Sequence, residues 1–176
     1  QPIFIIPMRW LGRLLAWNEL RIFDRVKDVP GVPHFFGRVG ETGIAHVFVP
    51  GRPLRRGDAL DETFFVQLDE MVKMFHEREA AIVDLEKPEN VLVGDDGRPY
   101  LTDFQISYAL PRNRLGRWFF GRLIFKVFCQ CDSFHYRKHV YRCRPDMLPQ
   151  DLIDRRLDPP FWLCWLRTSF AAASLL

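Results

Sequence analysis

Residues 82–107 read IVDLEKPENVLVGDDGRPYLTDFQIS, and this stretch decides how the rest of the chain is interpreted. Two apolar segments, Val91–Val93 and Pro99–Thr102, flank the turn sequence GDDG, a pattern typical of a β-hairpin. The hairpin predicts that Asn90, just before its first strand, lies close to Asp103, just after its second. An amide oxygen and a carboxylate held together in this way are hard ligands that suit Mg²⁺.

Two further side chains in the stretch suit group transfer. Asp84 precedes Asn90 in the same loop and can accept a proton from a substrate hydroxyl. Lys87, between them, can neutralise charge on a transferring phosphoryl group. The alternative is that Asp84 is a polar turn residue and Lys87 a solvated loop lysine.

The chain before this stretch predicts further helices and strands. The expected elements are helices over Trp10–Lys27 and Glu62–Glu79 and strands over His34–Val39 and Ile44–Val49. Asp61 stands where it can cap the second helix, whose apolar residues recur on one face. The sequence PGRP at 50–53 breaks the second strand and indicates a linker. After residue 110 we expect helices separated by proline-rich joints.

The stretch resembles a known family. Asp84, the sequence KPEN at 87–90 and the sequence DFQ at 103–105 are similar to the catalytic loop and metal-binding segment of protein-kinase-like phosphotransferases. The nearest groups are the bacterial atypical kinases of the lipopolysaccharide-kinase and RIO-like kind. The resemblance implies an α+β, protein-kinase-like fold, with an incomplete small lobe over residues 1–49 and a mostly helical large lobe over residues 50–176.

The resemblance also implies an activity, which is transfer of a phosphoryl group from ATP, with Mg²⁺, to a hydroxyl. The acceptor would be a protein serine or threonine or a sugar of a lipopolysaccharide-type glycolipid. Asp84 would be the base and Lys87 a phosphate contact, while Asn90 and Asp103 would hold the metal. Glu19, on the first helix, would be the glutamate that pairs with a strand lysine near the nucleotide.

The sequence departs from the family pattern within the catalytic loop. Asp84 lies six residues before Asn90, where the usual spacing is five, and Ile82-Val83 stand where His-Arg is usual. Without that arginine, phosphorylation of an activation loop has no partner at this position. Gln105 replaces a glycine, which is expected to restrict the backbone after the Asp-Phe pair.

A second departure concerns the nucleotide phosphates. The glycine-rich loop and the strand lysine are expected before Trp10, and residues 1–9 contain neither. We therefore expect Glu19 to have no partner and phosphoryl transfer by this chain to be impaired. A non-catalytic pseudokinase scaffold is the first alternative, and a peripheral membrane-binding protein is the second.

Charge bears on the second alternative. The chain carries +3 overall, but residues 111–176 hold 12 basic and 5 acidic side chains. This excess does not indicate nucleic-acid binding; it suits phosphate or an anionic membrane surface. Residues 117–128, RWFFGRLIFKVF, have a narrow basic edge on an apolar helix. Such a helix lies at a membrane interface or packs inside the domain with its basic ends reaching solvent, and we favour packing.

Cysteine usage favours a reducing, cytoplasmic compartment, with the inner membrane surface as the alternative site. A cluster of potential zinc ligands lies in the last third of the chain, where spacing alone leaves metal binding open. Its members are Cys129, Cys131, His135, His139 and Cys143. The acceptor and the oligomeric state are also left open.

Overall fold

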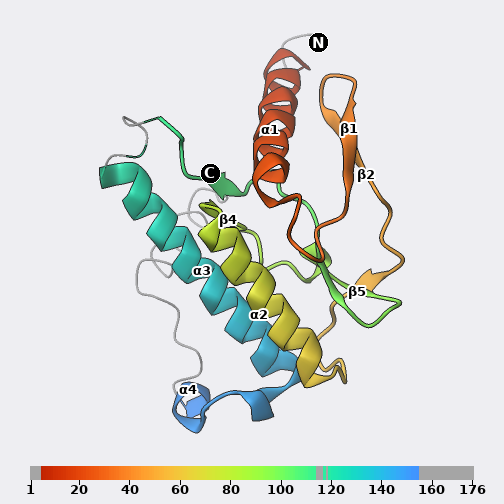
Figure 1. Cartoon of the computed structure of the whole chain (residues 1–176), viewed down its shortest axis with the longest axis vertical. Helices are drawn as coiled ribbons and strands as arrows, with labels where there is room; N and C mark the ends of the chain where they lie inside the picture. The colour runs from red at the N-terminus through yellow and green to blue at the C-terminus, as the bar shows by residue number, and fades with distance from the viewer. Residues whose placement is uncertain (1–4, 114–116, 118, 155–176) are drawn as a thin grey trace.

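The computed structural model describes residues 5–113, 117 and 119–154, and these combine helices and strands (Figure 1). The helices are α1 (Ile5–Val26), α2 (Glu62–Glu77), α3 (Phe119–Cys143) and α4 (Gln150–Asp154), with 3₁₀ turns at Pro88–Asn90 and Pro145–Met147. The strands are β1 (Phe35–Val39), β2 (Gly43–His46), β3 (Gly51–Pro53), β4 (Ala80–Ala81), β5 (Val91–Gly94), β6 (Pro99–Leu101) and β7 (Tyr108–Ala109). The expected α+β class is confirmed.

The strands form three small antiparallel sheets. β1 pairs with β2, β4 pairs with β7, and β5 lies between β3 and β6. The expected linker at 50–53 is wrong, because Gly51–Pro53 is itself a strand that pairs with β5. Gly51 has a φ of 154°, and a Cβ atom there would lie 2.3 Å from the carbonyl oxygen of Val93. Only glycine allows the two strands to approach this closely.

Helix α1 begins before the expected start at Trp10 and ends one residue before the expected end. Three residues on its inner face are buried near its C-terminal end: Ile22, Phe23 and Val26. Trp10 and Trp17, nearer the N-terminus, are 65% and 53% exposed. The periodicity therefore identifies the helix, but only its second half is packed against the core.

Helix α2 is the most regular element and matches the expectation. All six of its expected apolar side chains are buried: Phe64, Phe65, Leu68, Met71, Val72 and Phe75. The N-cap of this helix is formed differently from the expectation. Asp61 has extended N-cap geometry, but its side chain makes no capping hydrogen bond. Its backbone oxygen accepts from the Phe64 N–H at 3.1 Å instead.

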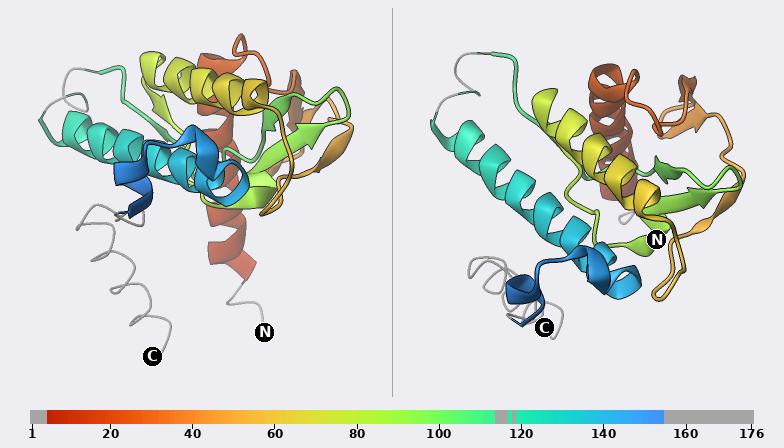
Figure 2. Two further views of the ribbon diagram at one scale, coloured as in Figure 1. Left: turned by 90° about the horizontal axis from the view of Figure 1, so that it is seen from below. Right: turned by 60° about the horizontal axis from the view of Figure 1, so that its bottom comes forward.

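Helix α3 packs beside α2, and Figure 2 shows the two helices side by side in both views. Phe125 and Phe128 turn inward, toward His76 of α2 and Tyr108 of β7. We expected residues 117–128 to pack inside the domain. For the opposite face of α3 this expectation is wrong. There, Phe120, Leu123 and Ile124 are between 43% and 65% exposed. The helix is apolar on more sides than α2 and β7 cover.

One continuous core joins the chain on either side of residue 49. Phe104 is fully buried, with its ring 5.1 Å from that of Phe23 and 5.4 Å from that of Phe75. The three rings come from α1, α2 and the segment after β6. The division into lobes over 1–49 and 50–176 stays a prediction, and the two parts share this core.

Candidate functional site

The β5–β6 hairpin places Asn90 and Asp103 at neighbouring backbone positions. Val91 is paired with Leu101, and the Thr102 N–H donates to the Asn90 carbonyl oxygen at 3.0 Å. Asp103 is the next residue along the chain. The two candidate ligands therefore leave the same end of one hairpin, as the turn sequence predicts.

Asn90 is also bound to the loop that precedes it. It is 4% exposed, and its Nδ2 donates to the backbone oxygen of Asp84 at 3.0 Å. This bond uses the amide nitrogen, so the Oδ1 atom is the side-chain atom that remains to accept a donor or a cation. This hydrogen bond therefore holds the backbone of Asp84 beside the hairpin.

Asp84 and Lys87 form an ion pair in this structure. The Lys87 Nζ atom lies 2.5 Å from Asp84 Oδ2, and the lysine side chain is 59% exposed while that of Asp84 is 16% exposed. The pair raises the pKa of Lys87, and the negative charge of Asp103 adds to the shift. Lys87 therefore keeps its positive charge close to both candidate carboxylates.

Asp132 of α3 anchors the loop. The sequence analysis did not identify this role. Its carboxylate is fully buried and accepts the backbone N–H groups of Ile82 and Val83 at 2.8 and 2.9 Å. His76 of α2 donates to the same carboxylate at 3.0 Å. A signal was present, since Asp132 is the sole acidic residue between Pro111 and Pro145. An isolated acid in an apolar helix indicates a buried charge with dedicated donors.

Backbone strain flanks the site on both sides. Val83 has a φ of 67° and Asp103 a φ of 61°, which is the left-handed region that residues with a side chain rarely adopt. Such positions persist where the surroundings determine them, and they gather at functional sites. The left-handed φ occurs at Asp103 and not at Gln105. This conformation therefore does not require a glycine at position 105.

The turn between Asp84 and Asn90 is held by α3. Glu86 accepts from the Lys138 Nζ atom at 2.6 Å and lies 3.9 Å from His135 Nε2. The neighbouring backbone oxygen of Leu85 accepts from His139 Nε2 at 2.6 Å. The residues between Asp84 and Asn90 therefore form a turn that is bonded to the helix behind it.

A cavity of about 530 Å³ opens beside this loop. Its lining includes Glu19 of α1, Ile44 of β2, Leu92 of β5 and Asp103 after β6. Of the candidate site residues, Glu19 and Asp103 line this cavity. Asp84, Lys87 and Asn90 are bonded to one another next to it.

Glu19 has partners other than the expected lysine. It is 5% exposed, and its carboxylate accepts the backbone N–H of Phe104 and the side-chain amide of Gln105. Burial raises the pKa of Glu19, and the nearby charge of Asp103 raises it further. The expectation that Glu19 is left without a partner is therefore wrong. Two carboxylates on one cavity leave an excess of negative charge that a cation would relieve.

The segment after Asp103 is fixed from both sides. Asn18 of α1 donates to the backbone oxygens of Gln105 and Ser107 at 3.0 and 2.7 Å. The Ser107 hydroxyl donates to the backbone oxygen of Ile82 at 2.9 Å. These bonds join α1, the loop before Asp84 and the segment after Asp103 into one unit.

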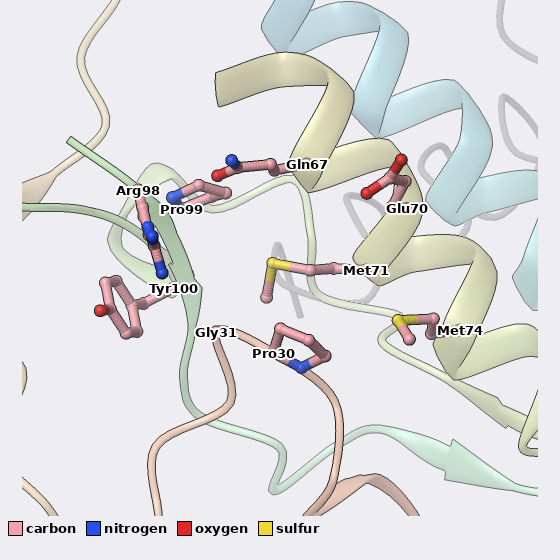
Figure 3. Close-up of a pocket in the computed structure, with 9 residues that line it drawn as sticks. All are labelled: Pro30, Gly31, Gln67, Glu70, Met71, Met74, Arg98, Pro99 and Tyr100. Atoms are coloured by element: carbon pink, nitrogen blue, oxygen red, sulfur yellow. The ribbon is translucent and has the colours of Figure 1, made fainter. Parts of the chain in front are cut away.

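A second cavity, of about 360 Å³, lies between α2, β6 and the turn after α1 (Figure 3). Met71 and Met74 point into it from α2, opposite Pro30 and Gly31. Gly31 has a φ of 85°, and a Cβ atom there would lie 2.6 Å from the Met71 methyl group. None of the candidate site residues lines this cavity.

The cysteine and histidine cluster does not assemble as a metal centre. In the described part of the chain, no three His, Cys, Asp or Glu side chains are grouped to hold an ion. His139 is bonded to Leu85, and the Cys143 thiol donates to the backbone oxygen of Arg55. Burial raises the pKa of Cys129 and of Cys131 to about 12. Burial therefore favours the protonated form of both thiols in the metal-free protein.

Comparison with known proteins does not assign this chain to a family. No family model matches the chain, and no curated protein is similar enough to it to be matched. None of the helices in the described residues has both the length and the apolar character needed to cross a bilayer. The candidate site therefore stands on its own geometry.

Proposed function

We propose that this chain has a protein-kinase-like fold and belongs to an enzyme that transfers a phosphoryl group from ATP to a hydroxyl. The observation that carries the proposal is the placement of Asn90 and Asp103 at one end of a single hairpin, with Asp84 bonded to Asn90. That arrangement supplies an amide oxygen, a carboxylate and a candidate base within one connected unit.

The donor set suits a magnesium ion. The Asn90 Oδ1 atom and the Asp103 carboxylate are the hard oxygen donors that Mg²⁺ prefers. Burial raises the pKa of Glu19 and the charge of Asp103 raises it further, so a cation bound between the two carboxylates would be stabilised. When bound, Mg²⁺ would neutralise charge on the nucleotide phosphates.

The remaining residues have roles that follow from their contacts. Asp84 would accept the proton of the acceptor hydroxyl, while the γ-phosphoryl group moves to the hydroxyl oxygen and ADP leaves. Lys87 would turn from Asp84 toward the transferring group, since its side chain is 59% exposed. Asp132 holds the backbone before Asp84 and acts as a positioning residue.

A specific observation favours low activity for this chain by itself. In the described part of the chain Glu19 is bonded to Phe104 and Gln105 and not to a lysine, so no lysine is held by Glu19 to contact the nucleotide phosphates. A pseudokinase scaffold that binds nucleotide or a partner protein is therefore the second candidate. The acceptor is proposed to be a protein hydroxyl or a glycolipid sugar.

The test is thermal unfolding of the chain with ATP, with and without Mg²⁺, together with a measurement of ATP turnover. We expect Mg²⁺ and ATP together to raise the melting temperature, and Asp103→Asn to remove that rise. Asp95→Asn, in the turn of the same hairpin, is the matched control and should keep it. A rise that survives in Asp103→Asn refutes the metal assignment, and a rise without turnover supports the scaffold.

A further inference from the structure

The cavity between α2, β6 and the turn after α1 has apolar walls (Figure 3). Met71 and Met74 line it with their thioether side chains, and Pro30 and Pro99 line it with their rings. Methionine sulfur makes favourable contacts with aromatic rings and adapts to their shape. The volume of about 360 Å³ lies near the lower end of the range for small-molecule sites, which suits a ligand with a small ring system.

The walls of this cavity are held in place by the fold. Met71 is 3% exposed and belongs to the buried face of α2. The Leu101 N–H donates to the backbone oxygen of Gly31 at 3.0 Å, which ties the turn after α1 to β6. The cavity is therefore formed before a ligand enters it, and such preorganisation lowers the cost of binding.

Glu70 supplies a negative charge on the rim. In residues 5–113, 117 and 119–154 it forms no hydrogen bond or ion pair, whereas the cations beside it have acids of their own. The Lys73 Nζ atom lies 2.5 Å from Asp69 Oδ2, and Arg98 Nε lies 4.0 Å from Asp96 Oδ2. Asp69 is the main cause of the raised pKa of Lys73, and Glu70 adds least to it.

We propose that this cavity binds a small organic cation with an aromatic body. The ring would lie among the methionine and proline side chains, and the ammonium group would pair with the Glu70 carboxylate. Gln67 lines the same rim one turn earlier on α2, where its side-chain oxygen would accept a second N–H. Charge complementarity selects a cation, because Lys73 and Arg98 are already paired. The proposal is independent of phosphoryl transfer, since it uses none of the candidate site residues.

The experiment is isothermal titration calorimetry of the full 176-residue chain with three probes that share an indole ring. Tryptamine carries a positive charge, tryptophol is neutral and indolepropionate is negative. We expect tryptamine to bind about five-fold more tightly than tryptophol, which is the upper contribution of an ion pair open to solvent. Indolepropionate should bind more weakly than tryptophol, because its carboxylate would face Glu70.

Variants on α2 locate the binding. Glu70→Gln should weaken tryptamine binding about five-fold and leave tryptophol binding unchanged, a difference that loss of folding would not produce. Met74→Lys places an ammonium group four residues after Glu70, where it pairs with the carboxylate, and should abolish the preference for tryptamine. Circular dichroism verifies folding, and Glu70→Gln carries the test if Met74→Lys does not fold.

The matched control removes the same charge elsewhere on the helix. Glu77 is exposed two turns after Glu70 and does not line this cavity. The titrations are made at about 0.15 M salt, where charges more than about 8 Å apart are largely screened. Glu77→Gln should therefore bind tryptamine as the unchanged chain does.

Three results would overturn the proposal. The first is no binding of tryptamine, and the second is equal affinity for tryptamine and tryptophol. The third is tryptamine binding that Asp103→Asn weakens and Glu70→Gln does not. That result would assign the amine to the cavity beside the candidate site.

Discussion

At the scale of single residues, Asp132 holds the loop that carries the candidate base. Its buried carboxylate accepts three hydrogen bonds, from the backbone of Ile82 and Val83 and from His76. Hydrogen bonds to a charged group contribute more than neutral ones, and a buried donor left without a partner is costly. This one side chain therefore fixes the backbone from which Asp84 follows, although the two residues lie 48 positions apart in the sequence.

Asp132→Asn is expected to lower the free energy of unfolding by about 3 kcal/mol, because one of the backbone donors then faces an amide nitrogen. Urea denaturation measures the loss. Asp69→Asn, which removes the exposed pair with Lys73 on α2, is the control and should cost less than about 1 kcal/mol. Equal losses in the two variants would contradict the anchoring role of Asp132.

Glu19→Gln is expected to raise the melting temperature at pH 7 in the absence of divalent cations. Burial and the charge of Asp103 raise the pKa of Glu19, so its charged form costs stability at neutral pH. Removing the charge should raise the melting temperature by about 2–4 °C, the change that about 1 kcal/mol produces in a domain of this size.

The gain from Glu19→Gln should shrink as the pH falls through the raised pKa, since the native glutamate then becomes protonated and uncharged. Scanning calorimetry at several pH values measures this. Glu89→Gln, on the exposed loop before β5, is the control and should show no comparable gain. A melting temperature that drops in Glu19→Gln would show that the carboxylate is stabilising.

At the scale of elements, α3 holds the loop that carries Asp84. Lys138 and His139 reach Glu86 and Leu85, so the turn between Asp84 and Asn90 is bonded to the helix behind it.

Glu86→Gln and Lys138→Gln are each expected to speed amide exchange of residues 85–89, because the tether to α3 is lost. The reversed pair, Glu86→Lys with Lys138→Glu, should restore part of the protection, which a loss of packing alone would not explain. Hydrogen exchange with mass spectrometry measures it. Asp146→Asn, which removes a pair with Arg144 after the same helix, is the control and should leave residues 85–89 unchanged. Unchanged exchange in both tether variants would refute the tether.

At the scale of the whole molecule, the buried histidines make stability depend on pH. His135 and His139 are 5% and 3% exposed, and burial lowers the pKa of both. The folded state therefore keeps them neutral, while the unfolded chain takes up protons near pH 6.5. Stability is full above that value and is lost as the pH falls below it.

We expect the urea midpoint to fall between pH 7 and pH 5, and His135→Gln with His139→Gln to flatten that fall. The variant should be less stable than the unchanged chain at pH 7, since His139 loses its bond to Leu85. His34→Gln, a histidine on the exposed loop before β1, is the control and should leave the slope as it is. An equally steep fall in the double variant would assign the pH dependence to other groups.

Some of this architecture follows from local sequence alone. The apolar period of α2 and the turn sequence between β5 and β6 involve neighbours within a few residues, so both elements were predictable. The pairing of β3 was not, because PGRP is a turn sequence by composition, and its strand forms only beside Val93. Local pattern also missed Asp132, whose donors lie in another part of the chain.

The sequence by itself determined that Asn90 and Asp103 come together, because the two ends of a tight hairpin lie side by side. Only the tertiary structure decided the partners of Glu19, the anchoring of Asp84 by α3 and the exposure of Phe120. Each of these depends on contacts between residues far apart in the chain. Such contacts depend on how helices stack and how much apolar surface remains uncovered, which local periodicity does not encode.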